Sequence, residues 1–535
     1  MPDDWIERAK KSEDPTRIIR ETLEKCLNGD SLSDLNHSLT ELADDEAYSH
    51  LLEPTPLELV PILLLANDAI NSHPQSLQET YEIIARHGSP KEVLLVAQES
   101  LDRLLQEAKE LENDEESAPS TPSQIIWKWL RLIDMYSLAF PRLIPRKRSA
   151  PDMASPVMQH LRDSFGPLGQ LVDPSEPVSQ ELVEACGRLG YALLAWFDAV
   201  GSKAHEIGEC KQTALEQLLS VAVAECLSDR HIMQGHNDFL YRLRTAGLAF
   251  TPTHSTVPNS KMTIHTRSQS IGAFVLYYLS NRGPVRPKGT RQALRAQLSG
   301  LSAAIQRPRW RQTALGAIND CVLGGLYEKD YLEEDIAAEL IPIISTPAST
   351  DPDPKHRAML FTLLTRMILT VQPMHAFKFV RDLASEECPY LNMRSAAVGL
   401  LRKLVVRAFS QNPPVEDDPF ASRLLLEDYK SILLQSPLFE GIDFAGSKSA
   451  DAQEVNRLVE VLGFFYVLLA RDENNLSGVR DTESIRELRN KLVNPLKKLA
   501  SAVDATLDDP SLFFALGSIS VSLERMEEVM SGISR

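Results

Sequence analysis

Residues 89–105 read SPKEVLLVAQESLDRLL and have the pattern of an amphipathic α-helix. Ser89 suits the N-cap, Pro90 suits the first turn, and Glu92 is placed to close a capping box. Behind this start, apolar residues recur at the spacing of one helix face: Leu94, Ala97, Leu101, Leu104 and Leu105. The stretch predicts a helix that buries one side against its neighbours.

The same spacing recurs along the chain, for example at Leu215, Leu218, Leu219, Ala222 and Cys226, and at Leu458, Leu462, Phe465 and Leu469. No run alternates cleanly between apolar and polar residues, and no Asn-Gly or Asp-Gly turn separates two apolar runs. No 33-residue or 34-residue consensus can be aligned, so a degenerate repeat of roughly 40–47 residues fits best. The sequence therefore predicts an all-α, irregular HEAT/armadillo-like α-solenoid of about twenty helices.

A chain of 535 residues exceeds the usual limit of about 300 residues for one compact core. Residues 112–122 are first acidic and then rich in Ser and Pro, a composition typical of a linker. We expect an N-terminal helical region at 1–112, a linker at 113–122, and a main helical-repeat body at 123–535.

Composition points to a water-soluble protein, with 43% apolar and 24% charged residues. The start lacks the basic and apolar segments of a signal peptide, and no stretch reaches 18 apolar residues. We expect no membrane span and a cytoplasmic location, with the nucleus as an additional compartment. The six cysteines form no CxxC pair, which favours reduced, buried thiols over a redox sensor or a metal site.

The formal net charge of −18 makes the chain a poor generic nucleic-acid binder. Yet residues 239–319 contain no Asp or Glu and twelve Lys or Arg, which leaves 44 basic residues against 74 acidic ones elsewhere. We call this stretch the basic belt. It is either a solvated face or a surface that binds an acidic protein, with nucleic-acid binding as a weaker alternative. Its cations are Arg242, Arg244, Lys261, Arg267, Arg282, Arg286, Lys288, Arg291, Arg295, Arg307, Arg309 and Arg311.

No set of residues indicates an enzyme or a cofactor site. The sequence has no phosphate-binding glycine loop and no GxSxG nucleophile motif. His205-Glu206 begins like a zincin motif, but Glu209 stands where the second His is needed. We predict no catalytic, cofactor-binding or metal-binding residues. Residues 145–148, Pro-Arg-Lys-Arg, are either a nuclear import signal or a solvated loop.

Two segments resemble the glomulin family. One is HGSPKEVLL at 87–95, and the other is FFYVLLARDENNLSGV at 464–479, continued by LVNPL at 492–496. The family includes glomulin, the plant aberrant lateral root formation protein, and fungal proteins that bind a bZIP oxidative-stress transcription factor and are tied to kinetochores. Val479 stands where glomulin has a Trp.

The resemblance implies a HEAT-like fold and a protein-binding role. In glomulin the C-terminal part binds the RING subunit of cullin–RING ubiquitin ligases and blocks the ubiquitin-charged E2. The leading hypothesis is therefore a ligase regulator; the alternatives are an adaptor for a bZIP factor in oxidative stress, and a transport or nucleic-acid adaptor that uses the basic belt. The residues expected to contact a partner are Arg471, Asp472, Asn474, Asn475, Gly478, Asn494, Pro495, Arg286, Lys288, Arg291, Arg295, Arg307, Arg309, Trp310 and Arg311.

Overall fold

The computed structural model describes residues 3–29, 31–113, 120–230, 264–281, 295, 297–328, 331–410, 418–439, 448–502 and 510–533. The chain divides into two compact units, Met1–Ala314 and Leu315–Arg535. Over these described ranges the regular structure is helical, and the only β-type pairing is an isolated bridge between Leu332 and Val371. The all-α helical-repeat fold expected from the sequence is confirmed.

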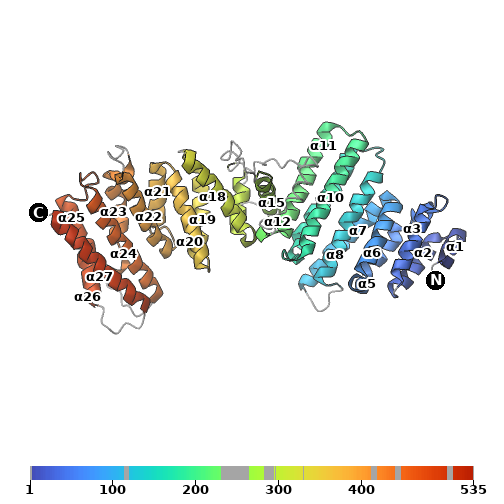
Figure 1. The fold of residues 1–535 in the computed structure, drawn as a ribbon, viewed down its shortest axis with the longest axis horizontal. Coiled ribbons are helices and arrows are strands. Elements are labelled where there is room, and N and C mark those ends of the chain that lie inside the picture. The colour runs from blue at the N-terminus through green and yellow to red at the C-terminus, as the bar shows by residue number, and fades with distance from the viewer. Residues whose placement is uncertain are drawn as a thin grey trace. The chain divides into compact units, whose positions relative to one another are not determined.

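Unit 1 is a stack of neighbouring helices (Figure 1). Its helices are α1 (Asp3–Lys11), α2 (Pro15–Leu27), α3 (Leu32–Asp44), α4 (Pro56–Leu65), α5 (Asn67–Ser72), α6 (Pro74–His87), α7 (Pro90–Asn113), α8 (Pro122–Ala139), α9 (Ala150–Leu168), α10 (Pro177–Ala199), α11 (Ala204–Cys210), α12 (Glu216–Cys226), α15 (Ile264–Asn281) and α17 (Leu298–Gln306). They pack in two rows. One row runs α4, α7, α9 and the other runs α6, α8, α10, and the last helix of each row packs against α12. This alternation is the arrangement of an α-solenoid.

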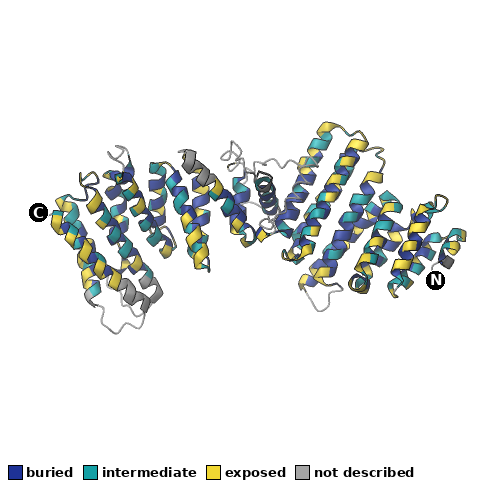
Figure 2. Cartoon of the chain, in the orientation of Figure 1, coloured by how far each residue is buried: buried dark blue, intermediate teal, exposed yellow. Residues whose placement is uncertain are grey.

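Unit 2 repeats the principle with α19 (Glu334–Thr350), α20 (Pro354–Thr370), α21 (Pro373–Ala384), α22 (Leu391–Phe409), α23 (Leu424–Leu434), α24 (Lys448–Arg471), α25 (Thr482–Leu488), α26 (Asn494–Ala502) and α27 (Pro510–Ile533). Helix α18 (Arg311–Glu328) contains the boundary between the units. Helix α24 packs between α22 and α27 and forms the centre of the unit. Buried residues line the sides of these helices that face their neighbours (Figure 2).

The stretch quoted first forms α7, and its apolar face is largely as expected. Ala97, Leu101 and Leu104 are buried, whereas Leu94 and Leu105 are half-buried. The buried face of α7 also includes Val93 and Val96, which are both at most 1% exposed. Its centre therefore differs slightly from the centre of the apolar face expected from the sequence. Residues 114–119 of the expected linker lie outside the described residues, and α7 and α8 on either side of them pack together within unit 1.

Thiols lie mainly inside the helical stack. Cys186, Cys210, Cys226 and Cys388 are buried and Cys26 is half-buried, all as free cysteines. Burial raises the pKa of Cys186 to about 12 and also raises the pKa of Cys226 and Cys210. A buried thiol with a raised pKa forms little thiolate, so we expect these three to react slowly with thiol reagents.

Glu216, at the start of α12, is a buried carboxyl, with 8% of its surface exposed. Burial raises its pKa to about 7, against the opposing effect of the Lys211 cation. The folded state therefore holds this proton more tightly than the unfolded state, whose glutamates titrate near 4.3. This carboxyl favours folding most at low pH, and that stability is lost as the pH rises from about 4 through 7.

We predict that Glu216→Gln raises the thermal midpoint at pH 8 by a few degrees and leaves it unchanged near pH 4, because glutamine imitates the protonated acid. Thermal unfolding followed by circular dichroism at both pH values measures this. The matched control is Glu209→Gln, at an exposed carboxyl on the neighbouring helix. Equal midpoints for Glu216→Gln and the parent protein at pH 8 would contradict the prediction.

Candidate functional site

The turn after α24 is built around the buried carboxylate of Asp472, which is 0% exposed. Its Oδ1 accepts from the backbone N–H of Leu476 at 2.7 Å. Its Oδ2 accepts from the N–H and the hydroxyl of Ser477 at 2.8 and 2.6 Å. Hydrogen bonds to a charged acceptor are stronger than neutral ones, so this carboxylate fixes the path of the turn.

Two residues of the turn have positive φ, as a tight reversal of the chain requires. Gly478 has φ 76°, a conformation that glycine adopts without steric cost, and Asn475 has φ 53°. Both polar atoms of the Asn475 side-chain amide are hydrogen-bonded. Its Nδ2 donates to Asp481 at 2.7 Å, and its Oδ1 accepts from the N–H of Arg480 at 2.8 Å.

Arg480, which the sequence analysis missed, closes the turn onto α24. Its Nε and Nη2 both donate to the carbonyl oxygen of Leu469, at 3.1 and 2.6 Å. Asp472, Asn475 and Gly478 therefore shape the turn, whereas the side chains of Arg471 and Asn474 are exposed. Of the predicted contact residues in this turn, Arg471 and Asn474 are the two that a partner can reach directly.

Asn494 and Pro495 belong to a different part of unit 2. The sequence suggests that Pro495 kinks its helix or ends it at Asn494. The helix does not end there, because a π-helical turn at Arg489–Val493 leads directly into α26. The wider turn accommodates the missing N–H and the bulky ring of proline. Asn494 is exposed, and Pro495 lines a groove.

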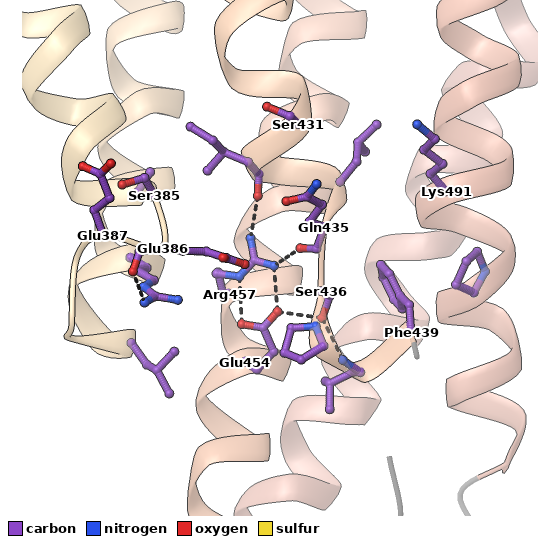
Figure 3. Close-up of a pocket in the computed structure, with 18 residues that line it drawn as sticks. Ser385, Glu386, Glu387, Ser431, Gln435, Ser436, Phe439, Glu454, Arg457 and Lys491 are labelled. Atoms are coloured by element: carbon purple, nitrogen blue, oxygen red, sulfur yellow. Dashed lines mark hydrogen bonds and ion pairs between the residues drawn. The ribbon is translucent and has the colours of Figure 1, made fainter. Parts of the chain in front are cut away.

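The groove has a volume of about 920 Å³ and is formed by segments far apart in the sequence (Figure 3). They are residues 384–394 before and within α22, residues 431–439 at the end of α23, two residues of α24, and Lys491 with Pro495. Leu391, Ile432 and Phe439 give it apolar lining. Figure 3 shows Glu386 and Glu387 on one side and Lys491 on the other.

A buried ion pair holds the groove together. Arg457 binds Glu454 through two hydrogen bonds, from Nε at 2.8 Å and Nη2 at 2.7 Å, and both side chains are at most 7% exposed. Nη2 of Arg457 also donates to the carbonyl oxygen of Gln435 at 2.6 Å, and Ser436 donates to Glu454 at 2.7 Å. The pair therefore fastens the segment after α23 onto α24 (Figure 3). Its polar atoms are satisfied by the protein, which makes it a structural element.

The two sides of the groove differ in charge. Glu386 and Glu387 are exposed, and their carboxylates make no hydrogen bond or ion pair with any residue that the structure describes. On the other side, Lys491 donates to Glu487 at 2.7 Å, and Lys430 also binds Glu487. These hydrogen bonds, first that of Lys430, lower the pKa of Glu487. The unpaired carboxylates therefore give the groove an acidic rim.

The groove and the C-terminal turn lie near opposite ends of α24. Arg457 and Arg471 are fourteen residues apart on this helix, which corresponds to about 21 Å along its axis. Of the predicted contact residues in unit 2, Pro495 lines the groove, Asn494 is its exposed neighbour in the chain, and Arg471 and Asn474 lie at the other end of α24. The sequence alone gives no sign that residues 384–394 and 431–439 line one groove, because these segments become neighbours only in the folded chain.

The described residues of the basic belt mainly make hydrogen bonds and ion pairs within unit 1. Trp310 is 0% exposed and donates to the carbonyl oxygen of Ala224 at 3.0 Å. Arg307 binds Glu225 at 3.0 Å, Arg309 donates to the carbonyl oxygen of Glu225, and Arg311 donates to that of Ile305 at 3.1 Å. Arg295 is exposed. Arg286, Lys288 and Arg291 lie outside the described residues, as do Arg242, Arg244, Lys261 and Arg282.

Asp472 should therefore be essential to the stability of the C-terminal turn. We predict that Asp472→Ala lowers the free energy of unfolding by about 3 kcal/mol, because it leaves the buried N–H and hydroxyl of Ser477, and the partly buried N–H of Leu476, without an acceptor. Urea unfolding of the full chain measures this. Glu473→Ala, at the exposed neighbour, should change stability by no more than about 0.5 kcal/mol. Equal losses in the two variants would show that the turn is held by something else.

None of the described helices is both long enough and apolar enough to span a membrane. In the same residues, no three His, Cys, Asp or Glu side chains are grouped so as to hold a metal ion. A search of curated proteins finds no match to the chain.

A family model described as "Uncharacterised protein family, YAP/Alf4/glomulin" matches residues 302–525. The match includes the segments 464–479 and 492–496 and leaves out 87–95. It covers most of unit 2, including the groove and the C-terminal turn. Residues 302–525 are thus similar to the YAP/Alf4/glomulin family, as the two C-terminal segments of the sequence indicated.

Proposed function

We propose that the protein is a non-enzymatic scaffold that binds a partner protein through the groove of unit 2. The observation that carries the proposal is the groove itself, which lies within the family match and combines an apolar lining with two unpaired carboxylates on its rim. Such a surface suits a partner segment that carries both apolar and basic side chains, because opposite charges across an interface speed and orient association.

The framework of the groove supports binding more than catalysis. Glu454 and Arg457 satisfy each other and nearby backbone groups, so neither is poised to transfer a proton. A catalytic site needs a nucleophile, acid or base that can reach a substrate. The exposed carboxylates of Glu386 and Glu387 instead suit electrostatic recognition.

The partner that the family resemblance favours is the RING subunit of a cullin–RING ubiquitin ligase. Bound there, the chain would block access of the ubiquitin-charged E2 and inhibit the ligase. We place this activity in the cytoplasm, with the nucleus as a second location. The alternatives are a bZIP stress transcription factor and an acidic or nucleic-acid partner of the basic belt.

Affinity purification of the full chain under nuclease treatment tests the partner. We expect a cullin and its RING subunit to be recovered, and the purified chain to slow ubiquitin transfer by the reconstituted ligase. Recovery of a bZIP factor without ligase subunits would favour the stress adaptor. Material that disappears with nuclease would favour the nucleic-acid adaptor.

Charge reversal on the groove rim tests the binding surface. We predict that Glu386→Lys with Glu387→Lys weakens partner binding at least about tenfold, mainly by slowing association, because both exposed carboxylates become cations. Surface plasmon resonance at two salt concentrations measures the association rate. The effect should shrink at high salt, since the Debye length falls from about 10 Å at 0.1 M to about 3 Å at 1 M.

The matched control reverses two exposed acids of α27, as Glu524→Lys with Glu528→Lys, which changes the net charge equally. If both double variants lose affinity by the same factor, only the overall charge matters and the groove is not the binding site. If Arg471→Glu weakens binding and the rim variant does not, the C-terminal turn is the contact surface instead.

A further inference from the structure

The loop between Leu143 and Ser149, in unit 1, projects a short cationic segment from the surface. Ile144 is 77% exposed, and Arg146, Lys147 and Arg148 are all exposed. The segment is neither helical nor paired with a strand. We call residues 144–148 the cationic loop. It lies outside the family match and far along the chain from the groove.

Both ends of the cationic loop are anchored. Leu143 is 3% exposed, and its carbonyl oxygen accepts from the indole N–H of Trp196 at 3.0 Å. Ser149 caps α9: its hydroxyl accepts from the N–H of Asp152 at 3.3 Å and donates to the Asp152 carboxylate at 2.8 Å. The five residues between these anchors are thus held away from the core in a short, non-helical segment.

The three cations of the loop are unpaired. Arg146, Lys147 and Arg148 make no side-chain hydrogen bond and no ion pair with any residue in the described ranges. The neighbouring Arg142 is the contrast, because its guanidinium donates to the carbonyl oxygens of Ala85 and Gly88 at 2.8 and 2.6 Å. Arg142 is therefore hydrogen-bonded within the fold, whereas the three adjacent cations of the loop have no acidic partner there, although the chain contains 74 acidic residues.

We propose that the cationic loop is a recognition segment for a nuclear import receptor, which binds it in a groove lined with carboxylates. Three adjacent cations in a short exposed segment match the basic clusters that such receptors read. Each cation keeps its hydrogen-bond donors free for a partner carboxylate. The exposed Ile144 adds apolar contact at the start of the segment.

Nucleic acid is the less suitable ligand for this loop. Three cations neutralise only a few phosphates, and each phosphate contact contributes a limited, salt-dependent share of affinity. The net charge of −18 repels the rest of a polyanion. A protein groove that encloses only the loop avoids this repulsion, because the charges outside the contact are screened within about 10 Å.

The test uses the full chain and a purified import receptor of the class that reads lysine-rich and arginine-rich segments. Fluorescence anisotropy measures the dissociation constant for the parent protein and for Arg146→Ala with Lys147→Ala and Arg148→Ala. We expect the triple variant to bind at least about tenfold more weakly. Ile144→Ser, which keeps every charge, should bind several-fold more weakly. In cells, the nuclear fraction of the triple variant, fused to a fluorescent protein, should fall.

The matched control removes three exposed cations from α7, as Lys91→Ala with Arg103→Ala and Lys109→Ala, and should bind within about twofold of the parent protein. Equal losses in the two triple variants would mean that diffuse charge is responsible and would overturn the proposal. Unchanged receptor binding by the loop variant, no binding by the parent protein, or a loss confined to RNA or DNA binding would overturn it as well.

Discussion

Burial of aliphatic side chains between neighbouring helices is the interaction on which every other feature of this protein depends. Aromatic residues are only 6% of the chain, so Leu, Ile, Val and Ala supply most of the core. A single amphipathic helix has no stable partner for its apolar face, and only the next helices in the stack cover it. Stability is therefore distributed along the chain, and each unit depends on contacts between adjacent helices.

Close packing sets where polar groups can be placed. Helices α22 and α24 meet where Gly399 and Gly463 leave room for the ion pair between Arg402 and Glu460, at 3.1 Å. A Cβ atom at Gly463 would lie 2.5 Å from the Arg402 guanidinium. Small residues thus let a charged pair cross a tight helix interface. The buried pair of Glu454 and Arg457 at the groove is stabilised in another way. Arg457 also donates a hydrogen bond to the backbone, which offsets the cost of burying the two charges.

The helical fold was predictable because its cause is local. Apolar spacing predicts the helix that contains Leu101 and Leu104, and the glycine in a polar turn predicts the positive φ of Gly478. The partner of each Lys or Arg side chain was not predictable, since it depends on which carbonyl or carboxylate from a distant part of the sequence lies close in the fold. Arg307 and Arg309 meet Glu225 across more than eighty positions of sequence, whereas Arg146 meets no partner in the described ranges. The groove was missed for the same reason, because it exists only after α21, α23 and α24 have packed.

The π-helical turn at Arg489–Val493 changes the angular phase of the chain that follows it. An α-helix advances about 100° per residue, so the one residue that a π-turn adds rotates everything beyond it by about that angle relative to an uninterrupted helix. Pro495 faces the groove on one side of this phase step, while Leu488 is buried on the other. A single codon deleted within residues 489–493 would remove both the extra residue and the step, and the two changes would offset each other, so Pro495 would still face the groove. Conversion of the turn to a regular α-helix without a deletion would instead rotate Pro495 by about 100°. The lining of the groove thus depends on helical phase as much as on side-chain identity, and the π-helical turn lets the chain carry one more residue here while the same face of the following helix meets the groove.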